Sequence, residues 1–294
     1  ISAVEHPATL AAALQLQARG WQLAVVPVDP QGRLDLEVLA SLLATPTRLV
    51  SLIWGQSEVG TLQSVEAIGA LCRAAGVPLH LDAVQVLGHR PIAFDRLPID
   101  FLSAAAHKLQ GPRGVGLLLA AAQAPLQPLI GGGSQEGGLR GGTEPVALAA
   151  GFAAAVQLAA DRLETQGGAD PIAVSRDRLL ELVLKLPGVR LSGVDPRDCP
   201  QQRLPHHLSL LVSSPAGRPL PGRALVRQLA ALGVAASSGS ACSSGGSSAS
   251  SVLRAMGYAE AEAGSGLRLS LGPWLSPVDL EPVPEEEELM DRLH

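Results

Sequence analysis

The part of this chain that most constrains its fold lies between residues 49 and 120, where short apolar runs alternate with helix-like segments. The runs occupy residues 49–54, 78–82, 101–105 and 115–120. The first reads LVSLIW, which is typical of a strand covered on both faces. Strands that alternate with helices predict an α/β fold with a mostly parallel sheet and helices on both faces.

The pattern changes after residue 163. Helix-like segments at 175–186 and 224–233, with short strand-like runs at 189–191 and 207–212, predict a smaller α+β domain. We therefore predict a large domain over residues 1–163 and a small C-terminal domain over residues 164–294. The small domain contains a Gly/Ser-rich segment, residues 235–251, with Cys242 near its centre.

Two ionisable residues stand at the ends of neighbouring runs. Asp82 ends the run at 78–82, and Lys108 follows the run at 101–105. Ligands of parallel sheets bind at the carboxyl ends of strands. A lysine and an acid in this position suit pyridoxal phosphate (PLP), which is attached through a lysine and needs an acid at its pyridine nitrogen. Taken singly, Asp82 could cap the next helix, and His107 with Lys108 could be an exposed pair.

Three further residues are candidates for chemistry. His6 lies at a strand-to-helix turn, where a histidine is more often structural, although an imidazole can stack on a cofactor and shuttle protons. Cys242 has few apolar neighbours, and such a thiol can become a nucleophile when its pKa is lowered. Arg268 is a cation in an apolar run, and its partner would be a substrate carboxylate or an internal salt bridge.

Composition argues against several other classes of protein. The formal net charge of -5 gives no reason to expect a nucleic-acid surface. The 3 cysteines are too few for a disulfide framework or a zinc site, which favours a reducing, cytoplasmic location. No signal peptide is visible, and the Ala-rich stretch at 147–160 is better explained as a core helix than as a membrane span. We expect no metal, nucleic-acid or membrane partner.

Motifs along the chain resemble those of a known family. In chain order they are EHPA at 5–8, SEVG at 57–60, HLDAVQ at 80–85, HK-x-x-GP-x-GVG at 107–116, R-x-G-T at 140–143, SSGSAC at 237–242 and LRLSLG at 267–272. As an ordered set over essentially the whole chain, they resemble the NifS/IscS-type (group I) cysteine desulfurases. These are PLP enzymes of fold type I in the class V aminotransferase group. The resemblance therefore implies a cysteine desulfurase.

The resemblance also implies roles for residues around the cofactor. Lys108 would hold PLP covalently, Asp82 would bind the pyridine nitrogen, and Gln85 would contact the phenolic oxygen. His6 would stack on the ring and help in proton transfer.

The phosphate and substrate residues follow from the same resemblance. His107 would bind the phosphate together with Thr143 of the partner subunit, which implies a homodimer with composite sites. Arg268 would bind the carboxylate of L-cysteine. Cys242 would attack the sulfur, leaving alanine and a persulfide for an acceptor protein, either an iron–sulfur scaffold or a thiolation carrier.

The sequence departs from the family in three places. Ser57 stands beside the ring where the family usually has Asn, and it is shorter. Ala105 stands where a Ser would bind the phosphate, and the loss of a hydrogen bond to a charged group costs about 1.5–3 kcal/mol. The chain also begins after the family's opening segment, whose Gly-Ala-Thr-type loop would bind the phosphate at a helix N-terminus.

Other readings of the sequence stay open. One is another enzyme of the class V aminotransferase group, an aminotransferase or a selenocysteine lyase; an aminotransferase would have no use for Cys242. A second is a non-catalytic truncated remnant of a desulfurase, which Ser57 and Ala105 favour and the retained Asp82 and Lys108 oppose. A dinucleotide-binding dehydrogenase is a distant third, because no G-x-G-x-x-G links a strand to a helix.

Overall fold

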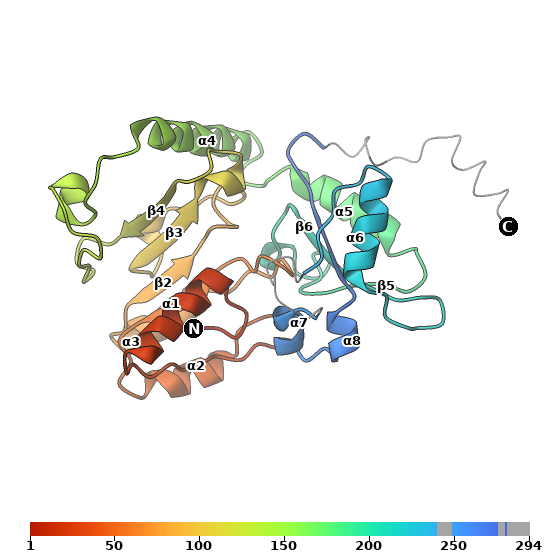
Figure 1. The fold of residues 1–294 in the computed structure, drawn as a ribbon, viewed down its shortest axis with the longest axis horizontal. Coiled ribbons are helices and arrows are strands. Elements are labelled where there is room, and N and C mark those ends of the chain that lie inside the picture. Colours follow the sequence, from red (N-terminus) through yellow and green to blue (C-terminus); the bar gives the residue numbers. More distant parts are fainter. Residues whose placement is uncertain (240–248, 276–279, 281–294) are drawn as a thin grey trace.

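The computed structural model describes residues 1–239, 249–275 and 280 of the chain. Figure 1 shows two neighbouring groups of elements, each built around its own sheet. The first group comes from the N-terminal half of the chain and the second from the C-terminal half. The predicted boundary between residues 163 and 164 remains a prediction; the long helix α4 (Val146–Glu164) ends at this point.

The first sheet has the strand order β1-β2-β3-β4. Its strands are β1 (Val50–Ile53), β2 (Leu79–Asp82), β3 (Phe101–Ala105) and β4 (Gly116–Ala120). The first three strands are parallel, as the alternation with helices predicted. Strand β4 is antiparallel to β3, because the short connection between them leaves no room for a crossover helix.

Side chains of successive strand residues point to opposite faces of this sheet. The apolar face is buried and is formed by Val50, Leu52, Leu79, Leu81, Leu102 and Ala104. The other face is polar for most of its width and only half-buried at Ser51, His80, Asp82 and Ser103. The sequence predicted that helices would bury both faces of this sheet. In the structure only the apolar face is fully buried.

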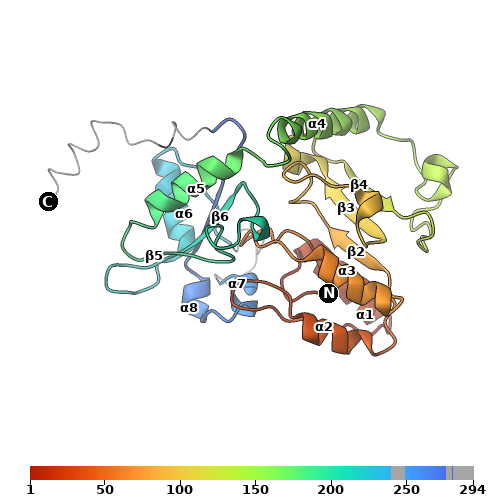
Figure 2. The ribbon, with the colours of Figure 1, turned by 180° about the vertical axis from the view of Figure 1, so that it is seen from behind.

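Helices lie on both sides of the first sheet. They are α1 (Pro7–Ala18), α2 (Leu36–Leu43), α3 (Val65–Ala74) and α4, with the short 3-10 turns η1 (Phe94–Arg96), η2 (Ala106–Leu109) and η3 (Gln135–Gly138). Helix α3 inserts Ile68 and Cys72 into the core of the apolar face. Helix α1 has no buried residue and lies on the opposite side, in front of the sheet in Figure 1 and behind it in Figure 2.

Helix α4 is the one helix of the described residues that is long and apolar enough to cross a membrane. Its residues Phe152, Ala155 and Ala159 are buried in the core of the first sheet. A single helix of this kind is weak evidence for a membrane span, because core helices pass the same test of length and composition. Only 22% of its apolar stretch is buried, so the core helix remains a prediction.

The second sheet is antiparallel, with the strand order β5-β6-β7. Its strands are β5 (Val189–Leu191), β6 (His207–Val212) and β7 (Gly266–Ser270). Around it lie α5 (Ile172–Val183), η4 (Pro200–Gln202), α6 (Gly222–Ala231), α7 (Ser251–Ala255) and α8 (Glu260–Ala263). This mixture of helices and antiparallel strands matches the α+β content that the sequence predicted for this region.

The buried Arg203 helps to join the two groups of elements. Its backbone pairs with Thr61 in an isolated antiparallel bridge, next to the end of β1. Its guanidinium donates to three backbone oxygens of the second group, at 2.9 Å to Ser192, 2.7 Å to Val194 and 3.1 Å to His207. Burial, followed by the charge of Arg176, lowers the pKa of Arg203 to about 9, so it still carries its charge at neutral pH.

Replacing Arg203 tests how much its buried guanidinium contributes to stability. Arg203→Leu leaves three buried carbonyl groups without their donor, so we expect the free energy of unfolding in urea to fall by about 3 kcal/mol or more. The matched control is Arg197→Leu, which removes an exposed ion pair with Asp195 and should cost no more than about 1 kcal/mol. Equal losses in the two variants would contradict the role of Arg203.

Candidate active site

The predicted cofactor residues meet at one edge of the first sheet. Because β1, β2 and β3 are parallel neighbours, their carboxyl ends lie side by side. Ser57 follows β1, Asp82 ends β2, and Lys108 lies in η2 directly after β3. Three segments that are separate in the sequence therefore bring their polar residues to the edge where parallel sheets bind ligands.

Asp82 is held at this edge by its own backbone turn. Its Oδ1 accepts a hydrogen bond of 3.0 Å from the backbone N–H of Val84, in the turn that also carries the half-buried Gln85. The capping role considered for Asp82 is thus present, although it caps a turn and not a helix. The contact fixes the carboxylate at the sheet edge, where it is compatible with a cofactor contact.

Turn η2 presents the lysine and its neighbour outward. Ala106 and Leu109 are buried and anchor the turn, whereas His107 and Lys108 are exposed. Slight burial, together with the positive charges of Lys108 and Arg113, lowers the pKa of His107. A neutral imidazole keeps one N–H donor, so His107 can still donate a hydrogen bond to a phosphate oxygen.

Arg268 reaches this edge from the second sheet. Its Nη1 donates to the carbonyl oxygen of Ser57 at 2.9 Å, and His207 Nε2 donates to the same oxygen at 3.1 Å. The predicted alternative, an internal salt bridge, does not occur among the described residues, where Arg268 pairs with backbone oxygen. Its Nε is buried and has no hydrogen-bond partner there, so the guanidinium retains donors for a carboxylate.

His6 lies beside the end of β1. Its Nδ1 accepts a hydrogen bond of 3.2 Å from Ala8 N–H and so caps α1, which is the structural role considered above. The residue before it, Glu5, accepts a hydrogen bond of 3.0 Å from the backbone N–H of Ile53. Since α1 lies on the polar side of the sheet, His6 and Asp82 share that side.

The remaining predicted residues are less constrained. Thr143 is exposed in the loop between η3 and α4, and its contribution to a partner's site remains a prediction. Cys242 lies outside the described residues. The SSGSAC motif begins at Ser237, which pairs with Arg268 through backbone hydrogen bonds of 3.0 and 2.6 Å. The motif therefore starts next to the candidate carboxylate-binding residue.

The structure adds Glu58, which the sequence did not single out beyond its place in SEVG. This glutamate follows Ser57 and is buried, and its Oε1 has no hydrogen-bond partner among the described residues. Burial raises the pKa of Glu58, while a hydrogen bond from Ser250 and the charge of Arg268 act in the opposite direction. An acidic residue in the turn that follows an apolar run is the sequence signal that could have identified it.

A buried histidine pair lies against the turn that carries Lys108. His89 stacks on His206 with ring centroids 3.7 Å apart, and its Nδ1 donates to Asp170 at 2.7 Å. A Cβ at the preceding residue, Gly88, would lie 3.0 Å from Leu109 Cβ of η2. Burial, and then the charges of neighbours that include His89, His207 and Lys108, keep the pKa of His206 well below its usual value.

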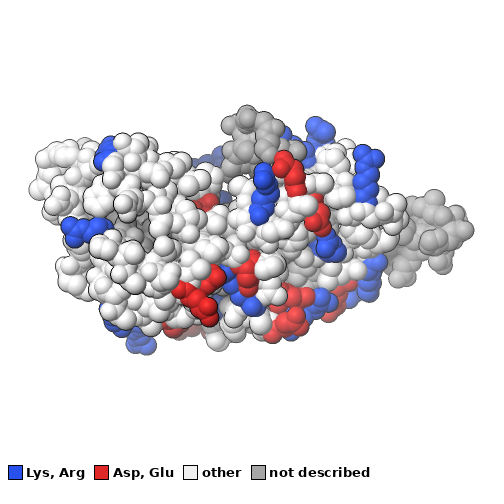
Figure 3. All heavy atoms as spheres, turned by 90° about the horizontal axis from the view of Figure 1, so that it is seen from below, with Lys and Arg blue, Asp and Glu red and all other residues white. Residues whose placement is uncertain are grey.

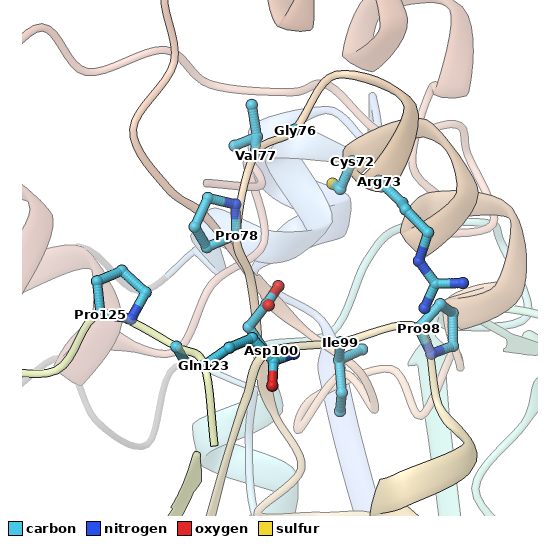
Figure 4. A pocket seen from close by; sticks show the side chains of 11 residues that line it. Cys72, Arg73, Gly76, Val77, Pro78, Pro98, Ile99, Asp100, Gln123 and Pro125 are labelled. Atoms are coloured by element: carbon cyan, nitrogen blue, oxygen red, sulfur yellow. The ribbon is translucent and has the colours of Figure 1, made fainter. Parts of the chain in front are cut away.

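A separate hollow of about 390 Å³ lies at the other edge of the first sheet. Its lining includes Cys72, Pro78 and Asp100, and Figure 4 shows how these side chains surround it. Pro78 and Asp100 directly precede β2 and β3, so the hollow faces the amino ends of the strands. Burial raises the pKa of Cys72 to about 11, which leaves its thiol protonated and a poor nucleophile. The candidate site is therefore not this hollow.

The distribution of charged side chains and of possible metal ligands bears on what this chain could bind. On the face shown in Figure 3, basic and acidic side chains are interspersed. No group of three His, Cys, Asp or Glu side chains within the described ranges could hold a metal ion.

Comparisons with known sequences identify the family. The Aminotransferase class-V model matches residues 1–282. The chain belongs to this family. A cysteine desulfurase of Cereibacter sphaeroides is 38% identical over 282 residues, which are 95% of this chain and 69% of that relative. The cysteine desulfurase NifS of Azotobacter vinelandii is 36% identical over 284 residues, which are 96% of this chain and 68% of that relative.

Solved structures agree with the sequence relatives. A NifS-like protein is 31% identical with a TM-score of 0.83, and the match covers 99% of this chain and 74% of that one. A NifS-like protein from Rickettsia africae is 30% identical with a TM-score of 0.81 and the same coverage. The predicted α/β fold of the PLP enzymes of fold type I is confirmed, and so is the enzyme class, a PLP-dependent cysteine desulfurase. The roles of individual site residues remain predictions.

The residues at the edge fit PLP by their chemistry. Asp82 supplies an acid for the pyridine nitrogen, and Lys108 supplies an amine for the aldehyde. Arg268, with its buried and unpartnered Nε, supplies a cation for a substrate carboxylate.

The neutral state of His206 predicts how stability depends on pH. In the unfolded chain a histidine takes up a proton near pH 6.5, whereas folded His206 resists protonation, so stability is lost as the pH falls below about 6.5. His206→Leu should reduce this loss by about 1.4 kcal/mol per pH unit, measured by urea unfolding between about pH 7 and 5.5. An unchanged pH dependence in the variant would show that His206 is protonated in the folded chain.

Proposed function

We propose that this chain transfers the sulfur of L-cysteine to Cys242, and that the edge of the first sheet is where it does so. The observation that supports this most is that Asp82 and Lys108 stand at the carboxyl ends of neighbouring strands, while Arg268 reaches the segment that follows β1. An acid, an amine and a cation with unused donors are the groups that PLP chemistry on an amino acid requires.

Four residues would bind the cofactor ring. Lys108 would hold PLP covalently, Asp82 would accept a hydrogen bond from the pyridine N–H, Gln85 would contact the phenolic oxygen, and His6 would stack on the ring. PLP, when bound, withdraws electrons from the substrate carbon. The protein's part is to hold the Asp82 carboxylate at the sheet edge, which its hydrogen bond from Val84 supports.

Two further residues would bind the phosphate. His107 donates from its imidazole, and Thr143 of the partner subunit adds its hydroxyl, so the active form is a homodimer. The exposed position of Thr143 agrees with contact to another subunit. Ser57 stands beside the ring in place of an Asn, and its backbone oxygen helps to hold Arg268.

Sulfur transfer then requires a bound carboxylate and a thiolate. Arg268 binds the carboxylate of L-cysteine, and the Cys242 thiolate attacks the substrate sulfur. An S–S bond forms as the Cβ–S bond breaks, the electron pair stays on the carbon, and a proton added there gives alanine. The resulting persulfide passes its sulfur to an acceptor, a cytoplasmic iron–sulfur scaffold or thiolation carrier.

The first prediction concerns the cofactor. The purified chain should gain an absorption band near the visible edge on addition of PLP, because Lys108 attaches it covalently, and Lys108→Ala should lack this band. Lys185→Ala, which changes a lysine in the second group of elements, is the control and should keep the band. Absence of the band from a folded wild-type chain would favour the remnant that binds PLP poorly.

A second prediction concerns the acceptor thiol. Cys242→Ala should bind PLP as the wild type does but release no alanine beyond background, because no thiolate remains to take the sulfur. The matched control is Cys199→Ala, which removes a half-buried thiol near Arg33 and should keep full turnover. Full turnover by Cys242→Ala would point instead to an aminotransferase or lyase that does not need this thiol.

A third prediction concerns the substrate. Arg268→Gln keeps one donor for Ser57 but removes the charge, so the KM for L-cysteine should rise by roughly 10-fold or more with a smaller effect on PLP affinity. Steady-state kinetics and PLP titration separate the two effects. An unchanged KM would show that another group binds the carboxylate.

A further inference from the structure

The half-buried face of the first sheet carries a row of polar side chains that the proposed reaction does not use. Ser51 on β1, His80 on β2 and Ser103 on β3 lie on this face. His80 Nδ1 is 2.8 Å from Ser51 Oγ, and His80 Nε2 is 3.1 Å from Ser103 Oγ. Both nitrogens of the imidazole are therefore matched by a hydroxyl on a flanking strand.

This row ends beside Asp82. Ser103 is the register partner of Asp82, so the two side chains leave the sheet as neighbours on the same face. His80 precedes Asp82 by two residues on β2 and shares that face as well. Burial lowers the pKa of His80, and the negative charge of Asp82 opposes this shift.

The hydrogen bonds of the row Ser51, His80, Ser103 can run in either of two directions. A neutral imidazole has one N–H donor and one acceptor, so the ring nitrogen that carries the proton sets the direction. With the proton on Nε2, Ser51 donates to Nδ1, Nε2 donates to Ser103, and the proton of the Ser103 hydroxyl is not used by His80. With the proton on Nδ1, Ser103 must donate to Nε2 and has no proton left for Asp82. A carboxylate acceptor favours the first direction, since hydrogen bonds to charged groups are the stronger ones.

We propose that His80 is a positioning residue for Asp82, and that the row Ser51, His80, Ser103 directs a hydroxyl proton toward this carboxylate. A hydrogen bond donated to a carboxylate favours its charged form. The charged form of Asp82 is the one that keeps the pyridine nitrogen of PLP protonated. His80 would thus act on the cofactor through Asp82 without touching it, and this role rests on the function proposed above for Asp82.

The first experiment needs no PLP. Nitrogen NMR on the ¹⁵N-labelled chain, with His80 assigned through His80→Gln, reports the tautomer and the pKa of this ring. We expect the proton on Nε2 at neutral pH, and in Asp82→Asn we expect the His80 pKa to fall further because the opposing charge is gone. A proton on Nδ1, or an unchanged pKa in Asp82→Asn, would overturn the proposal.

The second experiment measures the affinity for PLP by absorbance titration. Ser103→Ala removes the donor next to Asp82 and should weaken PLP binding by roughly 10-fold. Ser51→Ala is the matched control, because it removes the other hydroxyl of His80 but leaves the register partner of Asp82 in place, so its effect should be smaller. Equal effects of the two serine variants would overturn the direction assigned to the row.

Substitution of the ring itself completes the test. His80→Gln keeps a donor and an acceptor and should retain most of the PLP affinity, whereas His80→Phe keeps a ring without hydrogen bonds and should lose it. Equal affinity of these two variants would show that His80 only fills space. If His80→Phe does not fold, the comparison of Ser103→Ala with Ser51→Ala still decides.

Asp82→Asn distinguishes failure of this proposal from failure of the proposed function. If Asp82→Asn binds PLP as tightly as the wild type, then neither Asp82 nor His80 has the role proposed for it. If Asp82→Asn loses PLP affinity but Ser103→Ala and His80→Phe keep it, then the role proposed for His80 is wrong and that of Asp82 stands. Loss of affinity in all three variants supports both.

Discussion

The parallel hydrogen bonding of β1, β2 and β3 is the interaction on which the rest of the structure depends. It aligns three carboxyl ends, so that Ser57, Asp82 and Lys108 meet although long segments of chain separate them. The same register sorts the side chains into two faces. The apolar face packs against α3 and α4, and the polar face is left with the row that contains His80.

A second constraint is the junction between the two sheets. The carbonyl oxygen of Ser57 accepts hydrogen bonds from Arg268 and His207, and the backbone of Arg203 pairs with Thr61 at the same junction. Buried polar groups are costly unless they are paired, so these contacts restrict how the second sheet can sit against the first. The candidate carboxylate-binding residue is thereby placed at the edge that carries the cofactor residues.

The sequence predicted this edge well because strand ends can be recognised from a single segment. Asp82 and Lys108 each follow an apolar run, and parallel pairing turns that local fact into proximity. The histidine pair and the row through His80 could not be predicted in this way. His89 meets Asp170 and His206 across large sequence separations, and His80 meets Ser51 and Ser103 through register alone.

The sequence by itself determined the class of fold, the family and the candidates for the reactive groups, because apolar periodicity and ordered motifs are local properties of the chain. The tertiary structure alone decided which of these groups touch. It turned Arg268 toward a backbone oxygen instead of a carboxylate and buried Glu58 beside it. It also set two serines against both nitrogens of His80. Such contacts depend on register and on the packing of distant segments, and a linear pattern records neither.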